Sequence, residues 1–313
     1  MLSAWARAER WVLRSLLRPL IARGDVASWR RRAIAQPAPF GVRVVPTRMG
    51  GVAAEWLLPA DAGDTILYYL HGGGFVMGDP PLYRRMVGWL ARQAGTRTLV
   101  PDYRLAPEHP HPAALDDCVA GYRALVSRGI APEDIVIAGD SAGGALALAT
   151  LVALRDAGDP LPAAAALMSP VTDLTVSGAS MRTRADAEVL LAPRFCHLVA
   201  RLYLGGADAR AASPLFADLR GLPPLLVHVG TDELLFDDSA RLAEAARAAG
   251  VDVTLAVWPE LWHVFQMFVS MPEARRALDE IATFVRLHAR AAAAESALAD
   301  EADAEAVWAP ERA

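Results

Sequence analysis

The stretch IVIAGDSAG, residues 135–143, decides the fold of this chain of 313 residues. Its four leading apolar residues predict a buried strand, and the Ala/Leu-rich segment from Gly144 onward predicts a helix. Between them, Gly-x-Ser-x-Gly is the pattern of a nucleophile elbow, a sharp turn with Ser141 at its apex. Small residues flank the serine because a Cβ there would collide with the strand or the helix. A glycine-rich turn with an incidental serine is the alternative interpretation.

A second glycine-rich turn, HGGGF (residues 71–75), follows the apolar run 66–70. Three consecutive glycines are costly in backbone entropy, so a structural or chemical need must favour them. A phosphate-binding loop is one alternative, but the Lys and Ser/Thr of a Walker motif do not follow. The other is an oxyanion loop, whose backbone N–H groups face a substrate carbonyl in lipases and esterases. The two motifs together predict acyl-transfer chemistry.

The catalytic base is expected downstream of the serine, because the elbow goes with the chain order Ser, acid, His. His263 follows the predicted strand 253–257, and active sites of open α/β sheets form at the carboxyl ends of their strands. Of the seven histidines, His263 alone has both the right order and the right position. His71 precedes the three glycines and is expected to support the oxyanion loop.

The acid of the triad is expected after the strand 225–229, where Thr231-Asp232-Glu233 follows. Asp232 is preferred to Glu233 because it is closer to the end of the strand. Asp237 and Asp238 resemble N-terminal caps of the next helix. The predicted triad is therefore Ser141, Asp232 and His263.

Five motifs in this order resemble the bacterial hormone-sensitive-lipase family of α/β-hydrolases, the family IV esterases with GDSAGG. They are HGGGF, DYRLAPE (residues 102–108), GDSAGG, TDE (residues 231–233) and His263, and the resemblance extends from the first strand to the last core helix. It implies a serine carboxylesterase for short- to medium-chain acyl esters that forms an acyl-enzyme and needs no metal and no cofactor. The residues implied as oxyanion donors are Gly73, Gly74 and Ala142, with His71, Gly72 and Asp140 in supporting positions.

Two alternatives to an esterase remain open at this point. A lactonase or amidase would use the same acyl-enzyme chemistry, and the same fold also serves non-catalytic proteins that bind small molecules. The chain also departs from the family in the segment LWHVF (residues 261–265), where the histidine is often preceded by small residues or proline and followed by Gly-Phe. Trp262 adds bulk there. The candidates to line a substrate pocket are Phe75, Tyr83 and Trp262.

The alternation of short apolar runs and amphipathic segments predicts an α/β fold, with a mostly parallel eight-stranded sheet, helices on both faces and a helical cap. Strands are predicted at 42–45, 52–58, 65–70, 97–101, 135–138, 163–168, 225–229 and 253–257. Helices are predicted at 81–94, 113–128, 143–157, 193–203, 238–249 and 272–289. The expected units are an N-terminal cap segment (1–45), a catalytic core in two parts (46–170 and 215–289), a second cap segment (171–214) and a C-terminal tail or helical extension (290–313).

Residues 3–22 form a predicted amphipathic helix. Arg7, Arg10, Arg14 and Arg18 share one face, and the apolar residues are largely opposite. A helix on a membrane surface is one interpretation. The favoured one is a cap whose apolar face packs against residues 171–214 while the arginines face water.

Composition excludes several other classes of protein. A net charge of −5 gives no reason to expect a nucleic-acid partner, and all 31 basic residues are arginine, which indicates a GC-rich bacterial coding sequence. Cys118 and Cys196 lie in helix-like segments and are expected to be reduced thiols of a cytoplasmic protein. The expected partner is a small-molecule ester, without stable membrane association, and a homodimer is left open.

Overall fold

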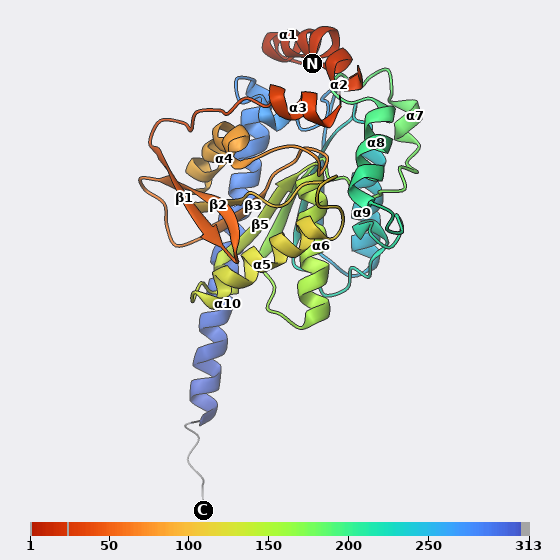
Figure 1. Cartoon of the computed structure of the whole chain (residues 1–313). Helices are drawn as coiled ribbons and strands as arrows, with labels where there is room; N and C mark the ends of the chain where they lie inside the picture. The colour runs from red at the N-terminus through yellow and green to blue at the C-terminus, as the bar shows by residue number, and fades with distance from the viewer. Residues whose placement is uncertain (1, 24, 308–313) are drawn as a thin grey trace, which may run out of the picture.

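Eight strands form one sheet, in the order β1-β2-β4-β3-β5-β6-β7-β8 (Figure 1). The structure is a computed structural model that describes residues 2–23 and 25–307, with side chains as far as Ala289. From β4 to β8 all neighbours pair in parallel, whereas β2 is antiparallel to both β1 and β4. The α/β fold and all eight predicted strands are confirmed. Their bounds are β1 (Val42–Met49), β2 (Val52–Pro59), β3 (Ile66–Leu70), β4 (Arg97–Pro101), β5 (Ile135–Asp140), β6 (Ala164–Met168), β7 (Leu225–Gly230) and β8 (Val253–Trp258).

Helices cover both faces of this sheet because its strands are apolar on both sides. Along β3, Leu67 and Tyr69 face one layer of helices, and Tyr68 and Leu70 face the other. The first layer consists of α4 (Pro80–Ala94) and α10 (Pro272–Val307), and the second of α5 (Ala113–Ser127), α6 (Ala142–Ala157) and α9 (Phe236–Ala248). The predicted helix 272–289 thus continues to Val307 as the helical extension. Residues 308–313 of the expected tail lie outside the described residues.

The carboxyl ends of four parallel strands bring the sequence motifs together. The glycine loop follows β3, the elbow follows β5, the acidic pair follows β7 and the histidine segment follows β8. In the sheet, β3 neighbours β5 and β7 neighbours β8, so motifs far apart in the chain share one edge.

A helical cap covers this edge of the sheet. It consists of α1 (Ala4–Val12), a π-helical turn (Leu13–Leu17), α2 (Arg18–Arg23) and α3 (Val26–Arg32), together with α7 (Ser180–Thr183) and α8 (Pro193–Leu204). Figure 1 shows the N-terminal helices and α7–α8 at the same end of the molecule. The ring of Trp29 in α3 meets the ring of Phe195 in α8 edge-on, with 4.9 Å between centroids.

The N-terminal segment is helical as predicted, and Arg7 and Arg14 face water, but the predicted orientation is wrong for four other residues. Trp11 and Leu16 are 67% and 58% exposed, whereas Arg10 and Arg18 turn inward and donate hydrogen bonds to the carbonyls of Ala187 and Ala185. The physical reason is that backbone carbonyl groups of the cap loop accept hydrogen bonds from the guanidinium groups of Arg10 and Arg18 and so draw them inward. Beyond residue 12, the π-helical turn at 13–17 also shifts the register of the helix. A pattern of period 3.6 therefore does not describe the whole segment.

No helix in the described part of the chain is long and apolar enough to cross a membrane. Cys118 and Cys196 are both free and buried. Burial raises the pKa of both thiols, which keeps them protonated and unreactive.

Candidate active site

Ser141 lies at the apex of the turn between β5 and α6, with φ 52° and ψ −120°. This left-handed conformation is rare for a residue with a side chain and stores strain at the turn. The turn is possible because its neighbours are small: a Cβ on Gly143 would overlap the carbonyl oxygen of Leu70 at the end of β3. The predicted strand, turn and helix of the nucleophile elbow are therefore present.

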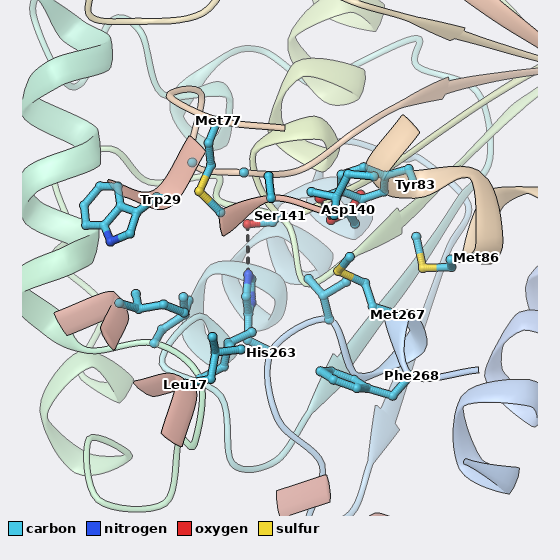
Figure 2. Close-up of a pocket in the computed structure, with 18 of the residues that line it drawn as sticks. Leu17, Trp29, Met77, Tyr83, Met86, Asp140, Ser141, His263, Met267 and Phe268 are labelled. Atoms are coloured by element: carbon cyan, nitrogen blue, oxygen red, sulfur yellow. Dashed lines mark hydrogen bonds between the residues drawn. The ribbon is translucent and has the colours of Figure 1, made fainter. Parts of the chain in front are cut away.

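His263 faces this serine from the segment after β8. Its Nε2 is 2.9 Å from the Ser141 Oγ, the hydrogen bond drawn in Figure 2. The imidazole is 4% exposed, so bulk water does not compete for that contact. The arrangement allows the histidine to take the serine proton as a general base.

Glu233 is the acid that reaches the histidine. One of its oxygens, Oε2, is 3.3 Å from Nδ1 of His263. The other, Oε1, accepts hydrogen bonds from the Gly230 N–H at 2.6 Å and the Ser169 hydroxyl at 2.8 Å. The carboxylate is fully buried and is fixed in direction by these bonds. It orients the imidazole so that Nδ1 carries the proton and Nε2 is free to accept one.

The prediction of Asp232 as the triad acid is therefore wrong. Its carboxylate points away from the histidine and pairs with the Arg10 guanidinium of α1, 2.7 Å distant. Consecutive residues after a strand project to opposite sides, and the longer side chain of Glu233 reaches His263 from one position further along. Proximity to the strand end, on which the prediction depended, does not determine which side chain faces the base.

A second buried carboxylate, Glu188 in the cap, also contacts His263. Its Oε2 accepts a hydrogen bond from the backbone N–H of His263 at 3.3 Å, and its Oε1 accepts from the N–H groups of Val189 and Leu190 at 2.8 Å each. The preceding residue, Ala187, is bound by Arg10. Glu188 thus connects the cap to the catalytic histidine. No spacing or motif in the sequence points to this residue, because it comes from a loop without regular structure.

The pKa of His263 results from opposing effects. Burial of the ring lowers it, but the hydrogen bond and charge of Glu233 raise it, with further contributions from the charges of Glu188 and Asp140. The balance raises the pKa above its ordinary value of 6.5. The surrounding carboxylates therefore stabilise the imidazolium that forms when the histidine takes a proton.

The residue after the histidine, Val264, has φ 47° and ψ 46°. A β-branched residue is strained in this left-handed conformation, which glycine adopts without such strain. Its N–H donates a hydrogen bond to the Ser169 hydroxyl at 3.1 Å. Since Ser169 also binds Glu233, this network fixes the histidine segment against the acid.

The glycine loop borders the serine. Gly73 and Gly74 line the same cavity as Ser141, and Ala142 is the first residue of α6, where a helix leaves N–H groups without intrahelical partners. Gly73 has φ 117°, and a Cβ there would overlap the carbonyl oxygen of Met77. The glycine is thus required by the close approach of the protein's own backbone as well as by access for substrate.

Four buried polar side chains, those of Tyr69, His71, Tyr83 and Asp140, support this loop from behind. Asp140 accepts hydrogen bonds from the Tyr69 hydroxyl at 2.7 Å and the Gly72 N–H at 3.0 Å, and the Tyr83 hydroxyl is 3.3 Å away. Burial raises the pKa of Asp140 to about 6 although these bonds favour the charged form. Burial lowers the pKa of His71 to about 4, so this ring is neutral at neutral pH. Its Nδ1 lies 2.8 Å from the Gly72 carbonyl oxygen.

A cavity of about 430 Å³ opens at the serine. Figure 2 shows Ser141 and His263 at its centre, between Trp29 and Met77 on one side and Met86, Met267 and Phe268 on the other. The cap contributes the apolar lining residues Leu17, Leu20, Ile21, Leu190, Leu191 and Phe195, and the polar lining residues include Glu9, Arg32, Gln36 and Arg85.

The three predicted pocket residues have different positions. Tyr83 lines the large cavity, and Phe75 lines a smaller one beside it. Trp262 lines neither cavity: its side chain is fully buried and packs edge-on against the Phe268 ring, 5.9 Å between centroids. Its side chain lies away from the site because it packs in the same hydrophobic cluster as Leu261 and Phe265. Within residues 2–23 and 25–289, no group of three or more acidic, histidine or cysteine side chains could hold a metal ion.

Known proteins resemble this chain along most of its length. A family described as alpha/beta hydrolase fold matches residues 67–267. An acetyl-hydrolase of Streptomyces hygroscopicus is 46% identical over 241 residues, which cover 76% of this chain and 81% of the relative. An esterase of Acinetobacter venetianus is 39% identical over 78% of this chain and 82% of its own length. The crystal structure of an esterase from the bacterial hormone-sensitive lipase family superimposes with a TM-score of 0.87 at 40% identity, covering 92% of this chain and all of that one.

Proposed function

The chain belongs to the bacterial hormone-sensitive-lipase family of α/β-hydrolases and is a serine carboxylesterase, and from this premise we propose the roles of its site residues. Ser141 is the nucleophile, His263 the general base and acid, and Glu233 the residue that orients and stabilises the histidine. The observation that carries the proposal is the continuous contact from Glu233 through His263 to the Ser141 Oγ.

The first half of the reaction forms the acyl-enzyme. Ser141 Oγ attacks the ester carbonyl carbon while His263 Nε2 takes the hydroxyl proton. The tetrahedral oxyanion accepts hydrogen bonds from the N–H groups of Gly73, Gly74 and Ala142, which stabilise its charge. The bond to the alcohol oxygen then breaks, and His263 returns the proton to that oxygen. The alcohol leaves, and the acyl group stays on the serine.

The second half uses water in place of the alcohol. His263 takes a proton from the water, whose oxygen attacks the acyl carbon, and the same oxyanion donors stabilise the second tetrahedral intermediate. The bond between carbon and Ser141 Oγ breaks, and the proton returns to the serine. A carboxylic acid is released and the enzyme is restored.

Substitution of the nucleophile tests the assignment. Ser141→Ala is expected to reduce hydrolysis of p-nitrophenyl acetate by several orders of magnitude and to abolish labelling by a fluorophosphonate, because both reactions need the Oγ. Circular dichroism and the melting temperature should stay close to those of the parent protein, since only one oxygen is removed. Near-full activity of this variant would contradict the proposed nucleophile.

We also propose that the enzyme acts in the cytoplasm on small-molecule esters, without stable association with membranes or nucleic acid. Two free, buried thiols support a reducing compartment, and the net charge of −5 disfavours binding to polyanions. Co-sedimentation with liposomes of phosphatidylcholine and phosphatidylglycerol measures whether the exposed face of α1 binds to membranes, and little protein is expected in the pellet.

A further inference from the structure

Two cavities of very different size meet at Ser141. The large one, about 430 Å³, is lined by Ser141 and His263. The small one, about 20 Å³, is lined by Ser141 and Gly74 but not by His263. Both cavities border the glycine loop and share the wall residues Gly74, Ser141, Leu191 and Phe195, so they adjoin each other at the serine.

The chemistry of the reaction determines which part of an ester enters each cavity. His263 must return its proton to the oxygen of the leaving alcohol, so this oxygen lies beside the imidazole. The alcohol therefore extends into the cavity that His263 lines, which is the large one. The carbonyl oxygen points to the N–H groups of the loop, and the remaining substituent, the acyl chain, is directed to the small cavity.

The size of the small cavity restricts the acyl chain. A volume of roughly 10–15 Å³ holds a single water-sized group, so about 20 Å³ accommodates little more than a methyl group. A butyryl chain would have to displace packed side chains of the cap and the loop.

The walls of the small cavity are held in place by their own packing. The Phe75 ring is stacked on Tyr203 at 3.8 Å between centroids, and Phe195 is fixed against Trp29. Val199 of α8 lies closest to the glycine loop, since a Cβ on Gly74 would be 3.1 Å from its Cγ1. Close-packed walls of this kind resist expansion by an extra methylene.

We propose that this enzyme is selective for acetate esters of large, apolar alcohols, with Val199 as the side chain that limits acyl length. The inference rests on the proposed function, because it uses the roles of Ser141 and His263. It goes beyond that function in assigning the small cavity to the acyl group and the large cavity, with Met86, Met267 and Phe268 in its wall, to the alcohol.

Two substrate series test the proposal on the full-length enzyme. With p-nitrophenyl esters, kcat/KM for the acetate is expected to exceed that for the butyrate at least tenfold and that for the octanoate further still. With acetate esters of primary aliphatic alcohols, whose leaving groups are nearly equal in acidity, kcat/KM is expected to rise from ethyl acetate to octyl acetate, because the larger alcohol buries more apolar surface. A butyrate or octanoate that is hydrolysed as fast as the acetate would overturn the proposal.

Matched variants test which cavity determines the selectivity for the acyl chain and which determines the selectivity for the alcohol. Val199→Ala is expected to raise the ratio of butyrate to acetate activity at least fivefold, whereas Val119→Ala, the same change at a buried position that lines neither cavity, leaves it unchanged. Met86→Ala is expected to change the relative kcat/KM values for acetate esters of different alcohols and to leave the ratio of butyrate to acetate activity unchanged. If Met86→Ala widened the acyl range and Val199→Ala did not, the assignment would be reversed. If Val199→Ala fails to fold, Met181→Ala enlarges the small cavity instead, because Met181 lines the small cavity and not the large one.

Different experimental results would refute this proposal and the proposed function. An enzyme that hydrolyses long acyl esters as well as acetates, and reacts with a fluorophosphonate, would refute the acyl limit alone. A folded protein that hydrolyses no ester and does not react with the fluorophosphonate would refute the catalytic assignment.

Discussion

Replacing either acidic residue after β7 by its amide distinguishes the triad acid from its neighbour. In Glu233→Gln the shape of the side chain is kept, and its carbonyl oxygen can still accept the bonds from Gly230 and Ser169. An amide NH₂ then faces His263 Nδ1, which stabilises the tautomer with the proton on Nε2. That tautomer cannot accept the proton of Ser141.

The expected loss follows from the distance. A carboxylate 3.3 Å from an imidazolium nitrogen stabilises it by about 5 kcal/mol at an effective dielectric constant of about 20. Since about 1.36 kcal/mol corresponds to a tenfold change in rate, kcat should fall by roughly 10³ to 10⁴. Asp232→Asn instead removes an ion pair with Arg10 at the edge of the cap, where both side chains are partly exposed. Such pairs contribute about 0–1 kcal/mol to stability, so kcat should change by only a few-fold.

The assay is the steady-state hydrolysis of p-nitrophenyl acetate by both variants, with circular dichroism and thermal melting to confirm that each is folded. The two kcat values are expected to differ by at least two orders of magnitude, with Glu233→Gln the slower. If Asp232→Asn loses activity and Glu233→Gln retains it while both remain folded, the assignment of the acid is refuted.

Three further perturbations have defined outcomes. Glu188→Gln removes a negative charge that raises the pKa of His263, so the pKa of His263 should fall. The acid limb of the pH profile of kcat/KM, which requires the neutral imidazole, should then move to lower pH. An unchanged acid limb would exclude the electrostatic role of Glu188. Removal of residues 1–23 should lower both activity and melting temperature, because it deletes the hydrogen bonds from Arg10 and Arg18 that hold the loop containing Glu188. Retained activity on soluble esters would show that residues 1–23 are dispensable for catalysis. Arg10→Ala should cause a loss of about 1–3 kcal/mol in the free energy of unfolding, measured with urea, whereas the exposed Arg14→Ala should not.

Local patterns in the sequence predicted the fold and the nucleophile. A strand, a turn and a helix are specified by nearby residues, so the apolar run before Gly139 and the small residues around Ser141 were sufficient to predict the elbow. The order of the strands then indicated which histidine is the catalytic base. His263 follows a parallel strand, and the carboxyl ends of parallel strands lie at the same edge of the sheet.

Only the tertiary structure decided which acidic residue contacts the histidine, which side chains of the N-terminal helix turn inward, and how large the cavities at the serine are. The choice between Asp232 and Glu233 depends on the directions of two adjacent side chains after β7, and both residues fit the same sequence order. The inward direction of Arg10 and Arg18 depends on carbonyl groups of a cap loop far away in the chain, which hydrophobic periodicity does not reveal. The contact of Glu188 with His263 joins a cap loop to a core loop 75 residues away. Sequence patterns specify local conformation and the order of elements, whereas side-chain direction and cavity size result from the packing of all the elements together.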